Sequence, residues 1–263
     1  MVRIGVFGAL GKMGATVCEA VQAAPDLELA GAVDPAHAGE QIEPGIIVGA
    51  DPADWRRSGV EVAIDFTDAS AASVNLAWCA ENGVHAVSGT TGLSADTIAE
   101  LRRRFNVPGA PNAVIAPNFA ITAVLLVRLA ELVAPHLEGV EVIELHHDQK
   151  RDSPSGTAIE TANRIAAART AAGAGPFSPD PTEQERLPGA RGARGAGGIA
   201  IHAVRLPGLV AHEEVIFGAL GQSLTLRQDS YDRRSFMPGV LLAARRVAAT
   251  PGLTYGLEPL LGL

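Results

Sequence analysis

Residues 2–14 read VRIGVFGALGKMG, and residues 27–34 read LELAGAVD. The apolar run 2–7 is short and leads into glycines, which is typical of a buried parallel strand. The segment 12–24 has apolar residues at helical spacing, and 27–34 again has the pattern of a strand. This order of strand, glycine turn, helix and strand is the first unit of a parallel α/β sheet.

Three glycines and one acid in this unit indicate a binding site. Gly8, Gly11 and Gly14 lie between the first strand and the helix, in the spacing GxxGxxG rather than GxGxxG. Glycines here allow a tight turn and let the backbone approach a pyrophosphate, whose charge faces the helix N-terminus. Asp34 ends the second strand, where a carboxylate would accept a hydrogen bond from a ribose 2′-hydroxyl. A turn that merely packs needs the glycines but not the acid, so the whole pattern predicts a dinucleotide site.

The same region bears on which dinucleotide binds. Asp34 is followed by Pro35, which cannot contact a 2′-phosphate as an arginine there would. Lys12, which otherwise fits a solvated residue at the helix start, can reach such a phosphate, and so can Arg3 if it lies near the end of its strand. A solvent-screened pair of charges is worth only about 1 kcal/mol, so attraction and repulsion nearly cancel. We therefore expect both NADH and NADPH to serve, with NADH equal or modestly preferred.

Strand and helix patterns alternate up to about residue 120. Further strands are predicted at 60–66, 85–88 and 113–116, with helices at 70–82 and after the N-cap residue Ser94. Repeated units of this kind, joined by right-handed crossovers, predict a Rossmann-like, doubly wound parallel sheet of the α/β class.

Two short segments follow strands of this sheet. GTTG occupies 89–92 and APNF occupies 116–119, each directly after a predicted strand. Such residues are ordinary turn material, but ligands of open parallel sheets bind beyond the carboxyl ends of the strands. Their shared position favours contact with the nicotinamide half of the cofactor.

The pattern changes after residue 120. A long apolar helix is predicted over 121–136, and strands then dominate, at 140–147, 199–206, 213–219 and 223–229. This order predicts a separate α+β domain with an open, mostly antiparallel or mixed sheet. The intervening segment 170–198 is rich in Gly, Ala, Pro and Arg and predicts a mobile loop. A last helix is expected over 235–250, and the apolar tail that follows is expected to pack back on the first domain.

Composition excludes several classes of protein. The 263 residues include 21 Lys and Arg against 29 Asp and Glu, a net charge of −8, so nucleic acid and anionic membranes are not expected partners. No stretch approaches about 20 uninterrupted apolar residues, so no membrane-spanning helix is expected. No secretory signal is visible either. The two cysteines, Cys18 and Cys79, cannot build a disulfide framework or a four-ligand zinc site, which favours a reduced, cytoplasmic setting.

The stretch 141–158, EVIELHHDQKRDSPSGTA, concentrates reactive side chains. His146 and His147 end a strand, and because adjacent strand residues point to opposite faces, the two cannot share one role. Lys150 can donate a proton or bind an anion, and an imidazole exchanges protons near neutral pH. PSGTA opens a helix whose N–H groups and Thr157 hydroxyl suit a carboxylate. Each residue alone also fits a cap or a surface pair, but together they predict a substrate site, and their spacing does not suit zinc.

This stretch closely resembles the signature of the dihydrodipicolinate reductase family, the 4-hydroxy-tetrahydrodipicolinate reductases of lysine and diaminopimelate biosynthesis. GALGKMG at 8–14, DFT at 65–67, GTTG and APNF also fall where the family has them, and HAVRLPGLVAHEEVIFG at 202–218 extends the resemblance over essentially the whole chain. The resemblance implies a homotetramer of two-domain subunits. Residues 1–119 with 232–263 would form the dinucleotide-binding domain, and 120–231 the α+β domain for substrate binding and oligomerisation.

The resemblance also implies roles for individual residues. His146 would be the catalytic proton donor or acceptor, and Lys150 the catalytic proton donor. Substrate contacts would come from His147, Gly156 and Thr157. The cofactor-binding residues would be Gly8, Ala9, Leu10, Gly11, Lys12, Met13, Asp34, Gly89, Thr90, Thr91, Ala116, Pro117, Asn118 and Phe119. We expect no metal site.

The expected reaction is the reduction of a small cyclic unsaturated dicarboxylate by NADH or NADPH. Hydride delivered to a ring carbon would leave an electron-rich enamine, which His146 or Lys150 would protonate, while Lys150 and the SGT helix start hold the carboxylates. Two alternatives are another two-domain amino-acid dehydrogenase and a non-catalytic dinucleotide sensor. A sensor would need the cofactor segments but not His146, Lys150 and SGT together.

Overall fold

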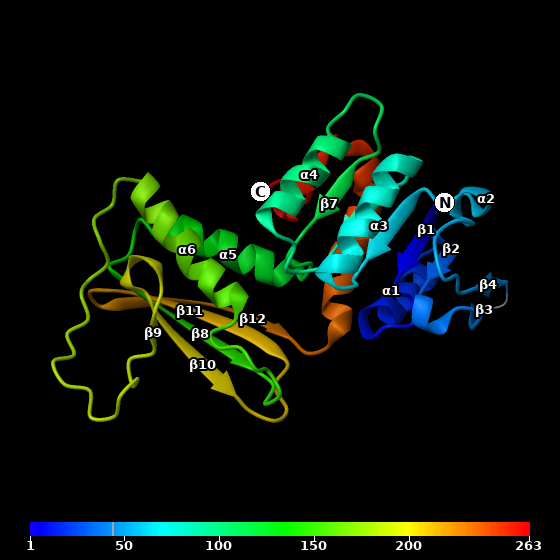
Figure 1. Cartoon of the computed structure of the whole chain (residues 1–263). Coiled ribbons are helices and arrows are strands. Elements are labelled where there is room, and N and C mark those ends of the chain that lie inside the picture. Colours follow the sequence, from blue (N-terminus) through cyan, green and yellow to red (C-terminus); the bar gives the residue numbers. More distant parts are fainter. Residues whose placement is uncertain (44) are drawn as a thin grey trace. The chain divides into compact units, whose positions relative to one another are not determined.

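The computed structural model describes residues 1–43 and 45–263. The chain divides into two compact units, Met1–Ile121 with Arg233–Leu263, and Thr122–Asp232 (Figure 1). The expected division, at 119/120 and 231/232, lies one or two residues from these bounds.

The first unit is built on a parallel sheet of six strands in the order β13-β7-β6-β5-β1-β2. Every pair of neighbours is parallel, and β1, the first strand in the chain, lies inside the sheet between β5 and β2. The strands are β1 (Val2–Phe7), β2 (Leu27–Val33), β5 (Val62–Asp65), β6 (His85–Ser88), β7 (Ala113–Ile115) and β13 (Leu253–Tyr255). The predicted doubly wound sheet is confirmed.

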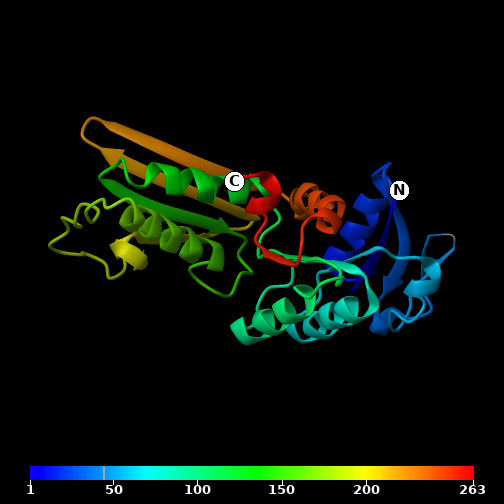
Figure 2. The same ribbon diagram turned by 90° about the horizontal axis from the view of Figure 1, so that it is seen from above.

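Helices cover both faces of this sheet. One face carries α1 and α7 and the other carries α3 and α4, as Figure 2 shows. Their bounds are α1 (Lys12–Ala23), α3 (Ala69–Asn82), α4 (Ala95–Phe105) and α7 (Met237–Arg246). The core between the sheet and its covering elements includes Phe7, Trp55, Leu76, Phe105 and Ile115. Large apolar side chains therefore fix the strands whose carboxyl ends carry the glycine loop, GTTG and APNF.

The structure adds elements that the sequence patterns did not predict. The tail was expected to pack on the first unit, and it also adds a strand to that unit: β13 pairs with β7 and extends the sheet. The predicted last helix is three pieces, two 3₁₀ turns (Arg233–Phe236 and Val247–Ala249) on either side of α7. The other additions are a 3₁₀ turn (Pro35–His37), β3 (Gln41–Glu43), β4 (Ile46–Ile47), α2 (Trp55–Ser58) and α8 (Glu258–Leu261). Elements of two to four residues are too short to show a period.

The second unit is a five-stranded mixed sheet in the order β12-β11-β8-β10-β9. β8 lies at its centre, parallel to β10 and antiparallel to β11. The strands are β8 (Gly139–His146), β9 (Ala193–Arg194), β10 (Ala200–Arg205), β11 (Ala211–Ala219) and β12 (Gln222–Ser230). Two helices, α5 (Ile121–Val133) and α6 (Gly156–Ala171), cover one face (Figure 1). The predicted α+β arrangement is confirmed.

The loop predicted over 170–198 is shorter than expected. α6 continues to Ala171, and the loop ends in β9 and a 3₁₀ turn at Ala196–Gly198. Inside it, Asp180 pairs with Arg191 and Arg194, and Arg191 also pairs with Glu141 of β8. These ion pairs attach the end of the loop to the sheet.

Among the described residues, no helix has the length and apolar character needed to cross a membrane. The same residues include no cluster of three or more His, Cys, Asp or Glu that could hold a metal ion.

Candidate active site

The carboxyl end of β8 carries the first predicted catalytic residue. Alternation along the strand turns Val142, Glu144 and His146 towards the helix-covered face, and Val142 and Glu144 are fully buried there. His146 is the last residue of β8, and its Nδ1 lies 2.6 Å from Glu144 Oε2. His147 follows beyond the strand and is exposed. The two histidines thus occupy different environments.

Glu144 joins four hydrogen-bonding groups at this point. Its Oε2 accepts from His146 Nδ1 and, at 2.7 Å, from Arg205 Nη1, while its Oε1 accepts from Arg205 Nη2 at 2.7 Å and from the Ser155 amide at 3.0 Å. Sequence reasoning assigned no role to Glu144 or Arg205. The signal was an acid on the strand face that otherwise carries Val140 and Val142, since a buried charge needs partners.

Burial and hydrogen bonding set the protonation states here. Burial alone would raise the pKa of Glu144, but hydrogen bonds from Arg205, His146 and Ser155 outweigh it and hold the pKa below its ordinary value. Burial lowers the pKa of His146, assisted by the charges of Lys150 and Arg205 and opposed by Glu144. His146 is therefore neutral near pH 7, donates Nδ1–H to Glu144 and keeps a lone pair on Nε2.

Lys150 lies in the turn that follows β8, close enough for its charge to act on His146. Its amide donates to the His147 carbonyl at 3.2 Å, and its Nζ lies 2.9 Å from both carboxylate oxygens of Asp152. The lysine hydrogen bond lowers the pKa of Asp152, so this carboxylate is ionised at neutral pH. The structure thus brings the predicted cation beside the predicted histidine.

The start of α6 completes this cluster. Ser155 is its N-cap, with the hydroxyl accepting from the Ala158 amide at 3.2 Å and its own amide directed to Glu144. The amides of Gly156 and Thr157 donate to no other residue that the structure describes. No acidic residue lies in the first turn. Free N–H groups at a helix N-terminus suit a carboxylate, as the sequence predicted.

In the first unit, the glycine loop is shaped by close packing. Gly8 has φ +64°, a left-handed conformation that favours glycine. A Cβ atom on Gly14 would lie 1.9 Å from the Gly8 carbonyl oxygen, so only glycine lets α1 approach the turn. Gly11 is the N-cap of α1, and neither a side-chain cap nor an acid occupies the first turn. This helix start fits a pyrophosphate, because its N–H groups are not taken by a side chain.

Asp34 ties this loop to the end of β2. Its two oxygens accept from the amides of Leu10 and Ala36, each at 3.2 Å. The remaining lone pairs can accept from a ribose hydroxyl. Lys12 is exposed at the first position of α1.

The suggested role of Arg3 is wrong. Arg3 lies at the opening of β1, at the end of the strand away from the glycine loop. There its guanidinium binds Glu28 at 2.7 Å and the Ser58 carbonyl at 2.9 Å. Because it is held at the amino end of the sheet, Arg3 cannot reach a phosphate bound at the carboxyl end.

Asp65, at the end of β5, organises the GTTG segment. This buried carboxylate accepts from Thr90 Oγ1 at 2.8 Å, from Thr67 Oγ1 at 2.9 Å and from Asn75 Nδ2 at 2.7 Å. The Thr90 hydroxyl is thus used inside the protein, whereas Thr91 is exposed. The DFT motif at 65–67 did not by itself predict this role of Asp65.

The APNF segment is a similar strand-end turn. Asn118 Oδ1 accepts from the Ala120 amide at 2.8 Å, and Ala116 and Phe119 are buried while Pro117 is exposed. A Cβ atom on Gly239 of α7 would lie 2.1 Å from the Phe119 carbonyl oxygen, so α7 supports the turn directly.

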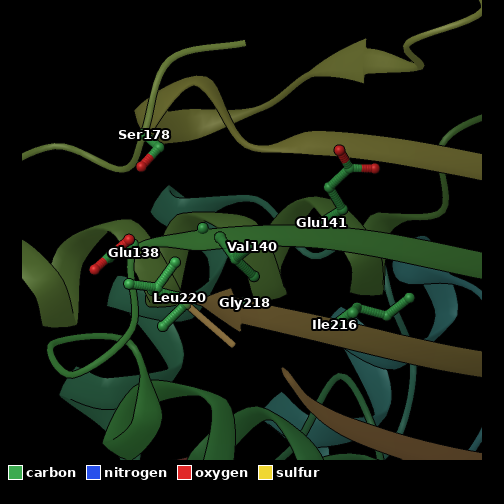
Figure 3. Close-up of a pocket in the computed structure, with 9 residues that line it drawn as sticks. Glu138, Val140, Glu141, Ser178, Ile216, Gly218 and Leu220 are labelled. Carbon is green, nitrogen blue, oxygen red and sulfur yellow. The ribbon is translucent and has the colours of Figure 1, made fainter. Parts of the chain in front are cut away.

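A hollow of about 510 Å³ lies elsewhere, at the opposite end of β8 from His146 (Figure 3). Its lining comes from the start of β8, the end of β11 and Ser178. None of the predicted site residues lines it, so shape alone does not locate the chemistry.

The chain matches known proteins over its whole length. Residues 2–119 match the family described as dihydrodipicolinate reductase, N-terminus, and residues 122–261 match its C-terminus. A 4-hydroxy-tetrahydrodipicolinate reductase from Nocardia farcinica is 50% identical over 262 residues, covering 100% of this chain and 99% of that protein. One from Thermobifida fusca is 49% identical over 264 residues, with 100% of both proteins covered.

Comparison with solved structures gives the same family. A dipicolinate-bound dihydrodipicolinate reductase from Paenisporosarcina sp. TG-14 superposes with a TM-score of 0.88 at 37% identity, covering 98% of this chain and 99% of that one. A myo-inositol dehydrogenase from Corynebacterium glutamicum, at 16% identity and a TM-score of 0.60, shares the fold alone. By sequence over its full length and by structure, this chain belongs to the dihydrodipicolinate reductase family.

Proposed function

We propose that this chain reduces 4-hydroxy-tetrahydrodipicolinate to tetrahydrodipicolinate with NAD(P)H and a proton, with the 4-hydroxyl leaving as water, a step of lysine and diaminopimelate biosynthesis. The observation that carries the proposal is the cluster of His146 and the α6 N-terminus on Glu144, with Lys150 in the adjoining turn, in a member of this reductase family. A silent dinucleotide sensor would have no use for such a cluster.

The first unit is a dinucleotide-binding domain. The proposed cofactor contacts are Gly8 to Met13, Asp34, Gly89 to Thr91 and Ala116 to Phe119. The reduced nicotinamide supplies a hydride when bound. The chain's own part is to position the cofactor, with the uncapped start of α1 facing the pyrophosphate and Asp34 facing the ribose.

The second unit holds the substrate in this proposal. The amides of Gly156 and Thr157 bind one carboxylate at the start of α6, and Lys150 and His147 contact the other side of the ring. A cyclic dicarboxylate matches these groups because two separate cationic or N–H-rich positions lie beside His146.

The protonation states divide the proton transfers between two residues. Neutral His146 has a lone pair on Nε2 and is a proton acceptor, whereas the Lys150 ammonium has protons to donate. We assign protonation of the reduced ring to Lys150. His146 takes up and relays protons beside it.

Both cofactors serve, in our proposal, with NADH equal or modestly better. Asp34 favours a free 2′-hydroxyl and repels a 2′-phosphate, while the exposed Lys12 offsets part of that repulsion. Arg3 contributes nothing to this balance because it lies at the other end of β1. Self-assembly into a homotetramer through the second unit also remains part of the proposal, and sedimentation equilibrium tests it.

Oxidation of NADH or NADPH with freshly generated product of the preceding synthase tests the function. Lys150→Ala should lose most turnover while NADH binding, measured by calorimetry, stays nearly intact, because Lys150 lies outside the dinucleotide-binding unit. Arg151→Ala is the matched control, since Arg151 is a neighbouring exposed cation on the same turn. A Lys150→Ala enzyme with near-wild-type kcat/KM would remove the assigned role. A wild-type protein that binds NADH without turnover would favour the sensor.

A further inference from the structure

Glu144 is a buried acid whose hydrogen bonds join three segments of the second unit. His146 of β8, Arg205 of β10 and Ser155 at the start of α6 all donate to its carboxylate. Arg205 lies 61 residues away in sequence, and its Nη2 also donates to the Asp152 carbonyl at 2.9 Å. One side chain thus fixes the histidine and the helix start directly, and it holds the turn that carries Lys150 through Arg205.

We propose that Glu144 is a positioning residue of this active site, which fixes the Nδ1–H tautomer and the orientation of His146 and aligns the start of α6 beside it. This inference rests on the proposed function, because Glu144 acts on that reaction through His146. A carboxylate that accepts from one imidazole nitrogen leaves the other nitrogen as the reactive atom.

The geometry leaves Glu144 no other arrangement. Oε2 faces Nδ1 of His146 and Nη1 of Arg205, and Oε1 faces the Ser155 amide and Nη2 of Arg205, so all four neighbours are donors. Glu144→Gln is close in shape but turns an N–H group towards one of these donor pairs. The variant therefore loses the charge and at least one hydrogen bond without opening a cavity.

The charged groups around His146 decide the direction of the pH effect. Besides Glu144, Lys150 acts from the following turn and Arg205 from β10, where it is the direct neighbour of His146. On β11, the direct neighbour of His146 is Ala211, and Glu213 lies opposite Glu144. Glu144 is the one of these groups that raises the pKa of His146; Lys150 and Arg205 lower it.

Glu144→Gln should therefore lower kcat about 10- to 100-fold, with a smaller change in KM for NADH. The limb of the pH–rate profile that His146→Ala removes should move to lower pH. That direction holds whether His146 must be neutral or charged to act, since in either case the limb follows the pKa of His146. An unmoved limb, or a kcat equal to the wild type, would overturn the proposal.

Two variants on the same sheet serve as controls. Glu141 is also on β8 and also bonds a histidine and an arginine, His202 at 2.8 Å and Arg191, but on the opposite face. Glu141→Gln should leave the limb in place, and an equal shift would show a general effect of charge. Glu213→Gln removes the neighbouring acid, whose pKa of about 7 adds a second titration near neutrality. If the limb disappears in Glu213→Gln, the limb belongs to Glu213 and the assignment to His146 is wrong.

A measurement without turnover separates this inference from the proposed function. ¹⁵N spectra of histidine-labelled wild-type protein, with His146 assigned by its loss in His146→Ala, should show the Nδ1–H tautomer, and Glu144→Gln should show a mixture. This holds even if the substrate assignment fails. An Nε2–H tautomer in the wild type would overturn the inference, and that result does not depend on the Glu144→Gln variant.

Discussion

At the scale of single residues, Asp34 and Lys12 carry the opposing charges of the proposed ribose site. Asp34 already accepts two backbone hydrogen bonds, so its carboxylate is held in place at the end of β2. Lys12 stands exposed at the start of α1, where water screens its charge. A fixed acid and a screened cation predict a weak discrimination between the two cofactors.

Wild-type kcat/KM should therefore agree for NADH and NADPH within about tenfold, which corresponds to about 1.4 kcal/mol. Lys12→Ala should weaken NADPH more than NADH, because only NADPH brings a 2′-phosphate to the lysine. Both constants should be measured at one fixed salt concentration. A wild-type preference for NADPH above about a hundredfold, or about 2.7 kcal/mol, would contradict this balance.

Glu213 predicts an unusual pH dependence of stability. Burial raises its pKa from 4.5 to about 7, against a hydrogen bond from Thr161 and with support from the charge of Glu144. Between these values the folded state holds a proton that the unfolded state has lost, so stability falls as pH rises from about 4.5 to about 7. The full loss is on the order of 3 kcal/mol.

Glu213→Gln should flatten that fall and raise Tm above neutral pH, as measured by thermal unfolding across the range. Glu214→Gln is the matched control, since Glu214 is the next residue of β11 but is only partly buried and pairs with Arg227 at 2.9 Å. Equal behaviour of the two variants would show that Glu213 is ionised in the folded protein.

At the scale of elements, Trp55 and two glycines join α2 to the first sheet. The Trp55 ring packs 4.5 Å from Phe7 between centroids and lies directly over Gly5 of β1 and Gly31 of β2. A Cβ atom on Gly31 would be 2.5 Å from Trp55 Nε1. Neither glycine has a side chain to pack, and the indole takes the space that two side chains would fill.

Gly31→Ala should therefore destabilise the protein by about 1–3 kcal/mol, the usual effect of overpacking a core. Urea unfolding followed by tryptophan fluorescence measures the change. Gly218→Ala is the control, because Gly218 is also a strand glycine but has open space where its Cβ would lie. If both variants lose the same stability, the loss reflects β-strand glycine in general and the Trp55 contact is unimportant.

At the scale of the whole molecule, the proposed cofactor and substrate residues belong to different units. The chain passes between the units twice, at residues 121–122 and 232–233. Hydride transfer requires the two ligands to touch. We therefore expect the units to close on each other when both ligands are bound.

Crystal forms without ligands and with both ligands, together with small-angle scattering of each state, measure this closure. The radius of gyration should fall on formation of the ternary complex and stay unchanged with NADH alone. Equal domain orientations in both forms, with the ligands already in contact, would rule the motion out.

Local patterns in the sequence determined much of this protein. The apolar runs and the change of pattern near residue 120 predicted both sheets, and the caps at Ser94 and Ser155 marked the starts of two helices. Each of these signals depends on residues within one turn or one strand. The candidate residues of the substrate site were visible for the same reason, since 18 consecutive residues contain His146, Lys150 and the α6 start.

Tertiary structure alone decided which groups act on those residues. Glu144 meets Arg205 across 61 residues and Asp65 meets Thr90 across 25, and no local period encodes either pair. The tail forms a sixth strand because β7 has a free edge with which it pairs. Arg3 binds Glu28 and not a cofactor phosphate, because the direction of β1 places Arg3 at the amino end of the sheet. The helix and strand patterns depend on residues that are neighbours along the chain. The protonation of His146 instead depends on burial and on charges that only folding brings near.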